Sequence, residues 1–310
     1  MYPQSHGPCG HRLSQVKFPD DINDPSKQDH MTTDLQRRRF LLGTGAFTGL
    51  AMAGCATPTS RTDIFDAHCH IIDTRYPIIA NQGYTPPSFP LEDYQQQTRP
   101  LGVTAGAIVS GSFHGNDQTY LRALLPRLGP RWVGVTQVAA DIPDAEIASL
   151  AAIGVRALRF NLFRGSIDSV DDIVSLANRA HAGGKWHAEI YADAAALRPH
   201  VAKLSKLPQI VIDHMGMTEA GLPVVLDLVD AGARIKVTGF GRVSMNIPKA
   251  IERIAARNPD ALMFGTDLPS TRAKRPFEPA DITLLRNVLG TQLAGKALWS
   301  NAVSLYRPTV

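Results

Sequence analysis

The stretch Ile64-Phe65-Asp66-Ala67-His68-Cys69-His70-Ile71-Ile72 places two histidines one residue apart inside an apolar run. Side chains alternate across a β-strand, so a strand here puts His68 and His70 on one face and turns Cys69 to the other, where we expect it to be a small core residue. Paired imidazoles indicate a catalytic or metal site, whereas a single histidine in an apolar strand is more often a hydrogen-bonded core residue. The run therefore predicts a buried strand with a site at its end.

Short β-branched or apolar runs continue along the chain and alternate with Ala- and Leu-rich amphipathic stretches. This alternation is typical of repeated βα units, and eight strands close a (β/α)8 TIM barrel of the α/β class. We expect strands at 64–72, 104–111, 132–138, 155–162, 185–192, 209–216, 233–239 and 261–267. We expect helices at 117–128, 144–153, 170–182, 197–205 and 247–257, and a loop over the barrel mouth at 73–90.

Composition supports one globular domain behind an N-terminal extension. The chain has 310 residues, 44% hydrophobic and 19% charged, so it can bury a large core. Residues 61–310 suffice for one barrel, whereas residues 1–60 lack apolar periodicity and are expected to be disordered outside a targeting signal. The net charge is only +4 and no basic block with interleaved aromatics occurs in 61–310, so nucleic acid is not an expected partner.

The extension carries the zones of an export signal between Met31, an alternative start to Met1, and Cys55. Arg37-Arg38-Arg39-Phe40-Leu41 resembles a twin-arginine signal, which implies that the protein is exported folded. Ala51-Met52-Ala53 fits cleavage to a soluble periplasmic form, whereas Ala53-Gly54-Cys55 resembles a lipobox and would place a lipid on Cys55. We expect a periplasmic protein and prefer the lipid-anchored form.

Polar residues stand near the C-terminal ends of most expected strands, where active sites of such barrels form. Taken alone, each has a structural alternative: a histidine can be a core residue, Asp267 a helix N-cap, Arg159 half of a buried ion pair, and Lys236 the partner of Glu189. Together, several imidazoles and a carboxylate on different strands are costly to bury without a shared task. The residues expected to face one cavity are His68, His70, His187, His214 and Asp267.

Several motifs resemble the amidohydrolase superfamily, and within it the amidohydrolase-2 group, over residues 63–307. They are DAHCHI (66–71), the histidine of the fifth strand, IDHMG (212–216), GTDLP (265–269) and ALWSNAVSLYR (297–307). A closer resemblance is to hydrolases similar to 2-pyrone-4,6-dicarboxylate lactonase, a group that includes sugar lactonases. It rests on SFHGNDQTYLRALL (112–125), GVRALRFNLFRG (154–165), KWHAEIYAD (185–193) and VTGFGRVS (237–244).

The resemblance implies hydrolysis of the ester bond of a small anionic lactone. Asp267 would be the base that activates water, while His68, His70 and His214 would polarise the carbonyl, directly or through an ion. The substrate-binding residues implied are Arg159, Arg164, Arg242, Tyr191, Ser112, His114 and Tyr84. Either no cofactor is required, or one Zn-like divalent ion is bound by His68, His70, His187 and Asp267.

Two features separate this chain from such lactonases. Leu268-Pro269-Ser270 stands where they usually carry Trp, Pro and His, and export is unexpected for an enzyme of catabolic intermediates. The alternatives are a metal-dependent decarboxylase, an amide hydrolase or a sugar lactonase of the same superfamily. An alternative of another class is a non-catalytic exported lipoprotein that serves as a binding module.

Overall fold

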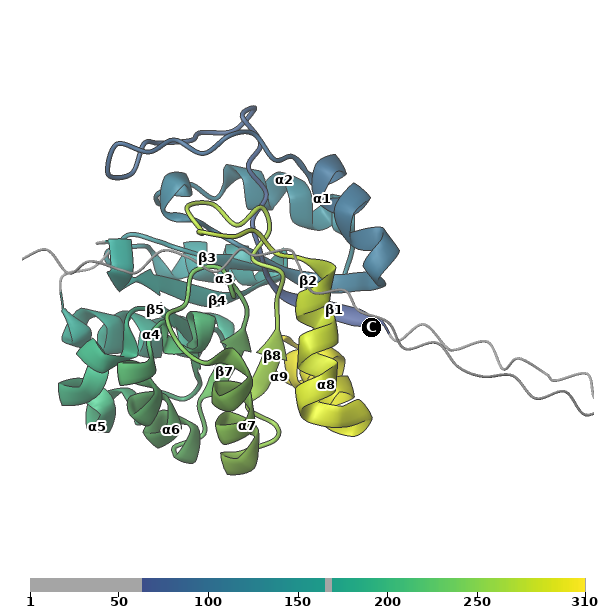
Figure 1. Ribbon diagram of the computed structural model, residues 1–310. Coiled ribbons are helices and arrows are strands. Elements are labelled where there is room, and N and C mark those ends of the chain that lie inside the picture. Colours follow the sequence, from purple (N-terminus) through teal and green to yellow (C-terminus); the bar gives the residue numbers. More distant parts are fainter. Residues whose placement is uncertain (1–62, 165–168, 310) are drawn as a thin grey trace, which may run out of the picture. The chain divides into compact units, whose positions relative to one another are not determined.

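A computed structural model describes residues 63–164 and 169–309. The predicted extension at 1–60, with its signal and Cys55, lies outside the described residues. The described chain forms eight parallel strands that follow one another in sequence order around a barrel, with helices on the outside (Figure 1). The predicted TIM barrel is therefore confirmed.

Each predicted strand is present, although several end earlier than expected because their polar last residues form turns at the barrel mouth. The strands are β1 (Ile64–Cys69), β2 (Val103–Val109), β3 (Trp132–Thr136), β4 (Val155–Asn161), β5 (His187–Tyr191), β6 (Ile210–Ile212), β7 (Arg234–Val237) and β8 (Leu262–Phe264). The pairing register of β1 with β2 shifts between Asp66 and Cys69. Such irregularities re-aim side chains, and here the shift occurs where the histidines begin.

The helices are α1 (Leu91–Thr98), α2 (Thr119–Leu128), α3 (Asp144–Ala152), α4 (Val170–Gly184), α5 (Val201–Leu204), α6 (Leu222–Asp230), α7 (Ile247–Arg257), α8 (Pro279–Gly295) and α9 (Asn301–Tyr306). Helix α7 has the predicted bounds because Asn246 caps its first turn, its side chain accepting from the Lys249 N–H. The helix expected at 197–205 is instead a 3₁₀ segment followed by the short α5, and Pro199, which lacks an N–H, lies where the two meet. None of the described helices combines the length and the apolarity that crossing a bilayer would require.

Two hydrophobic cores hold the barrel together. The larger lies between the strands and the surrounding helices and includes Cys69, which is fully buried as predicted. The smaller fills the floor of the barrel, where Phe65 stacks on Tyr306 of α9 with ring centroids 5.5 Å apart. Above this floor the barrel interior is polar, and the site lies at the C-terminal ends of the strands, where the packed barrel leaves no pore.

The barrel closes where the chain beyond β8 meets β1. The N–H of Asp267 donates to the His68 carbonyl at 2.7 Å, and the Thr266 hydroxyl donates to the buried Asp66 carboxylate at 2.6 Å. A Cβ at Gly265 would lie 2.7 Å from the His68 Cβ, so only glycine allows the two segments to approach this closely. The closure places Asp267 beside the first histidine.

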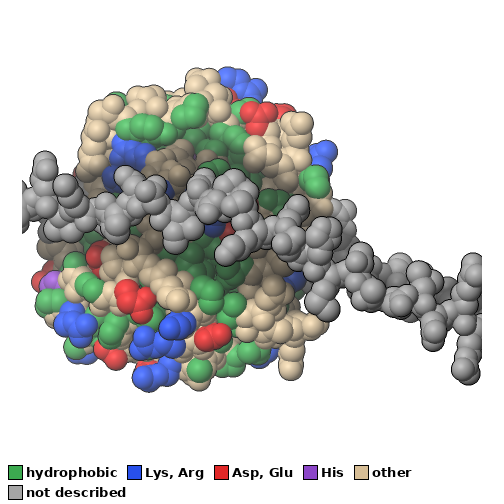
Figure 2. Space-filling view, viewed as in Figure 1, with side chains coloured by type: hydrophobic (Ala, Val, Ile, Leu, Met, Phe, Trp, Pro, Cys, Tyr) green, Lys and Arg blue, Asp and Glu red, His purple; other side chains and the backbone are tan. Residues whose placement is uncertain are grey.

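The segment predicted as a loop at 73–90 contains only isolated bridges, one of them pairing Asn81 with Tyr84, and it lies over the mouth of the barrel (Figure 1). On the face seen in Figure 2, basic and acidic side chains are interspersed over the lower helices.

Candidate active site

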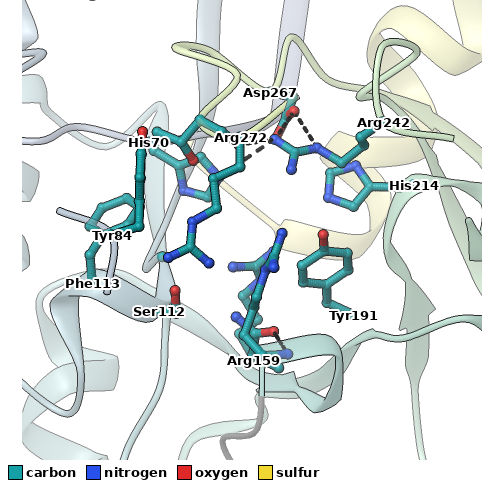
Figure 3. Close-up of a pocket in the computed structure, with 14 residues that line it drawn as sticks. His70, Tyr84, Ser112, Phe113, Arg159, Tyr191, His214, Arg242, Asp267 and Arg272 are labelled. Atoms are coloured by element: carbon teal, nitrogen blue, oxygen red, sulfur yellow. Dashed lines mark hydrogen bonds and ion pairs between the residues drawn. The ribbon is translucent and has the colours of Figure 1, made fainter. Parts of the chain in front are cut away.

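The inner part of the site brings together three histidines and one aspartate at the ends of three strands. Figure 3 shows two of the histidines, His70 and His214, beside Asp267. The ring of His68 lies 5.0 Å from that of His70 and 4.9 Å from that of His214, measured between centroids. Asp267 Oδ1 lies 3.8 Å from His68 Nε2 and 3.7 Å from His70 Nε2. The predicted convergence of these four side chains is thus observed.

Asp267 is fully buried, and its two oxygens have different surroundings. Arg242 donates to Oδ2 from Nε at 2.8 Å and from Nη2 at 2.5 Å, whereas Oδ1 has no hydrogen-bond partner among the described residues. Burial alone would raise the pKa of Asp267, but the Arg242 guanidinium holds it well below its usual range. Asp267 caps no helix, since α8 begins at Pro279. It is an ionised carboxylate with one oxygen free.

A buried ion cluster lies beneath the histidines. Lys236 contacts Glu189 Oε2, as its alternative interpretation predicted, and its Nζ lies 3.5 Å from Asp213 Oδ1 and 3.2 Å from His68 Nδ1. Arg159 Nε donates to Asp213 Oδ2 at 3.0 Å. Burial would raise the pKa of Asp213, but the charge of Lys236 holds it well below its usual range. The opposite charges of the cluster therefore compensate one another, and Lys236 and Asp213 contact the Nδ1 side of the His68 ring.

The tautomers of the first two histidines follow from their partners. His68 Nδ1 lies 3.2 Å from Lys236 Nζ, which only donates, and 3.4 Å from Asp213 Oδ1, which only accepts; when Lys236 donates to it, the neutral ring carries its proton on Nε2, toward Asp267. His70 faces the Val109 carbonyl at 2.8 Å through Nδ1, which must donate, so its Nε2 is a free acceptor. Burial lowers the pKa of both rings and lowers that of His214 to about 3. At neutral pH all three imidazoles are uncharged.

A pocket opens above this group, and its empty space of about 380 Å³ includes open solvent. It is lined by most of the predicted substrate-binding residues, namely Tyr84, Ser112, Arg159, Arg164, Tyr191 and Arg242. Arg159 pairs with Asp213, which confirms its interpretation as half of a buried ion pair, and its Cζ lies 5.1 Å from the centroid of the Tyr191 ring. Its role in substrate binding stays a prediction.

Two predicted site residues lie elsewhere. His114 faces away from the pocket: its Nδ1 accepts from the Gly111 N–H, its Nε2 lies 3.1 Å from the Ile71 carbonyl, and its ring stacks on Tyr120. His187 lies at the start of β5, near the barrel floor, with Nε2 3.0 Å from Glu189 Oε1. It shares a face with Tyr191 as predicted but lies four residues earlier on β5, and among the described residues it is not part of the group whose ligand atoms lie within reach of one ion.

Sequence reasoning missed several pocket residues. Asn161 shares the inward face of β4 with Arg159, so alternation gave a signal for it. Phe113, Thr271 and Arg272 come from turns, where no strand or helix period predicts which side chains point inward.

His214, rather than His187, completes the group that can hold a metal ion. His68, His214 and Asp267 each offer a ligand atom within 4.8 Å of the others, and the His68 Nε2 and Asp267 Oδ1 atoms are buried without partners among the described residues. Ligation through His68 Nε2 would require its Nδ1 proton to be donated to Asp213, whose Oδ1 is 3.4 Å away. These donors fit one divalent ion of zinc type, which would lower the pKa of a bound water.

The barrel and its strand-end histidines and aspartate define a barrel hydrolase, in which a carboxylate faces neutral imidazoles below a pocket lined by arginines. The chain belongs to the amidohydrolase family, whose amidohydrolase-2 model matches residues 65–307.

Several known proteins are similar to this chain. The 2-pyrone-4,6-dicarboxylate hydrolase of Comamonas testosteroni is 27% identical over 274 residues, which cover 78% of this chain and 90% of that protein. The 4-sulfomuconolactone hydrolase of Hydrogenophaga intermedia is 27% identical, covering 71% and 80%. The solved structure of a candidate 2-pyrone-4,6-dicarboxylic acid hydrolase from Pseudomonas putida is 25% identical, with a TM-score of 0.69 over 79% of this chain and 98% of that one.

Proposed function

We propose that this chain hydrolyses the ester bond of a small carboxylated lactone, with Asp267 as the base that activates water. The observation that carries the proposal is the Asp267 Oδ1 atom, which is ionised, buried, without a hydrogen-bond partner among the described residues, and directed toward two histidines. Ester hydrolysis needs such a base. The relatives named for 2-pyrone-4,6-dicarboxylate and 4-sulfomuconolactone support the class of substrate.

The attacking water fits between Asp267 and His70. Asp267 Oδ1 and His70 Nε2 both accept hydrogen bonds and lie 3.7 Å apart, so one water molecule can donate to both and turn a lone pair toward the pocket. As the water oxygen bonds to the lactone carbonyl carbon, Asp267 takes its proton. The ring ester C–O bond then breaks, and the departing oxygen takes the proton that Asp267 received, which returns Asp267 to its ionised form.

Donors for the developing oxyanion surround this position. The His68 Nε2–H and the Arg242 guanidinium both lie beside the Asp267 carboxylate. Because His68 is fully buried, the Arg242 side chain is only 9% exposed and both are already held by the protein, they stabilise the negative charge with little reorganisation. Together they supply the electrophilic assistance that hydrolysis requires, and we propose that a metal ion is not obligatory.

A substrate screen tests the proposal and separates it from its alternatives. Protein purified without chelator should open the ring of dicarboxylated lactones. Treatment with a chelator, with metal analysis to verify removal of any ion, should change the rate by no more than about twofold, because Asp267 and Arg242 belong to the chain itself. Loss of activity on chelation would contradict the metal-free mechanism and favour a metal-dependent decarboxylase or amide hydrolase. Turnover of sugar lactones alone would indicate a sugar lactonase, and no turnover of any lactone would favour the binding module.

We also propose that the protein is exported through its twin-arginine-like motif and lipid-anchored at Cys55. Replacing Arg37 and Arg38 together by Lys should retain the protein in the cytoplasm, whereas the matched change Arg39→Lys, at the variable position of the motif, should not. Cys55→Ser should move the exported protein from the membrane fraction to the soluble periplasm. Cell fractionation with an antibody measures all three, and an unchanged distribution in the double variant would contradict export by this route.

A further inference from the structure

Four arginines line the pocket, and they differ in how their charges are balanced. Arg159 and Arg242 lie deep, and each is paired with a buried carboxylate, Asp213 and Asp267 respectively. Arg164 and Arg272 lie nearer the mouth, and neither has a carboxylate within 4.0 Å among the described residues. The unbalanced positive charge of the described pocket is therefore concentrated at its outer end.

One tight turn in the β1–α1 segment holds both outer arginines. Asn81 and Tyr84 exchange backbone hydrogen bonds of 3.0 and 3.1 Å across Gln82 and Gly83, whose φ values of 51° and 73° are those of a hairpin turn. The Gln82 side chain accepts from Arg164 Nη1 at 3.4 Å. The turn therefore contacts Arg164 at the outer end of the pocket.

The same turn positions Arg272, which comes from the β8–α8 segment. Its Cζ lies 4.4 Å from the centroid of the Tyr84 ring, and its Nη2 donates to the Asn81 carbonyl. Burial, and after it the nearby charge of Arg164, lower the pKa of Arg272, so the two guanidiniums repel each other. In Figure 3 the Arg272 side chain lies among the residues that line the pocket. An anion between the two guanidiniums would relieve their repulsion.

We infer that Arg272 binds substrate and, with Arg164, forms an outer anion subsite that selects lactones carrying a second acidic group. The inference rests on the proposed function and adds to it a residue and a charge requirement. Because the deep arginines already have carboxylate partners, recognition of a distal carboxylate or sulfonate falls to the outer pair. The ring of the lactone would then lie between this subsite and Asp267.

The kinetic test compares two pyrones that differ by one carboxylate. Arg272→Gln should raise KM for 2-pyrone-4,6-dicarboxylate about tenfold or more, with kcat largely retained. For the pyrone that carries only one carboxylate, the same change should alter KM less than about twofold. Arg272→Lys should recover part of the loss because it keeps the charge without the planar fork. The matched control Arg286→Gln removes an exposed arginine of α8 and should change neither KM. An equal rise in KM on both substrates, or no rise, would overturn the inference.

A binding test keeps the subsite separate from the chemistry. Pyridine-2,4-dicarboxylate has no ester to hydrolyse, so calorimetry can measure its binding to the intact protein whether or not the protein hydrolyses lactones. The dissociation constant of pyridine-2,4-dicarboxylate should be lower for the wild-type protein than for Arg272→Gln by a factor of about ten or more. The two proteins should bind pyridine-4-carboxylate with equal affinity. Such discrimination without lactone turnover would leave the subsite standing and reject the proposed function. Equal binding of the dicarboxylate by both proteins would reject the subsite.

Discussion

Replacing Asp267 by Asn should lower the rate of lactone hydrolysis about 10³-fold or more, while leaving the protein folded. The amide cannot take the proton of water, and general-base groups contribute roughly 10²- to 10⁴-fold. Asn also tolerates the left-handed backbone at this position, where φ is 60°, and its oxygen can still accept from Arg242. Steady-state kinetics would measure the loss, with circular dichroism and the melting temperature to show that the fold is kept.

The matched control is Asp260→Asn, because Asp260 is a partly exposed residue that pairs with Lys296 far from the pocket. Its rate should equal that of the wild type. A rate for Asp267→Asn within about tenfold of the wild type would show that another group activates water, since it is smaller than the effect of losing a general base.

Replacing Lys236 by Met should destabilise the protein by about 3–5 kcal/mol, a large share of the ~5–15 kcal/mol that usually separates native from unfolded domains. Lys236 is fully buried between Glu189 and Asp213, so its loss leaves two buried carboxylates with less compensation. Met has a similar shape, which limits any effect of a cavity. Urea unfolding followed by fluorescence or circular dichroism would measure the change in the free energy of unfolding.

Two further variants identify the cause of this loss. The double variant Lys236→Met/Glu189→Gln removes both charges and should recover part of the stability, because the two substitutions affect the same ion pair. Lys296→Met removes a lysine from a partly exposed ion pair and should have a much smaller effect. If Lys236→Met were no more destabilising than Lys296→Met, the buried cluster would contribute little to the fold.

Much of this fold could be predicted because buried parallel strands repeat a simple pattern. Alternation correctly placed His68 and His70 together and Cys69 in the outer core. Strand ends carried the polar residues, and the structure brings His214 and Asp267 to the same point. These successes depend on local geometry, which a strand imposes on its own side chains.

Height along the barrel and the direction of turn residues were not predictable in the same way. His187 shares a face with Tyr191, but alternation does not say which residue reaches the mouth and which lies near the floor. His114 sits in a turn that directs its ring onto backbone groups. Arg272 reaches the pocket because a distant turn at Asn81 binds it, a contact between segments that no local period records.

The most direct test of the central claim is the product formed from 2-pyrone-4,6-dicarboxylate in water enriched in ¹⁸O. If Asp267 activates water for attack on the lactone carbonyl, mass spectrometry should find a ring-opened product that has gained one water, with the ¹⁸O in the newly formed carboxylate. Release of carbon dioxide, or recovery of the unchanged pyrone, would contradict the assignment of this chain as a lactone hydrolase.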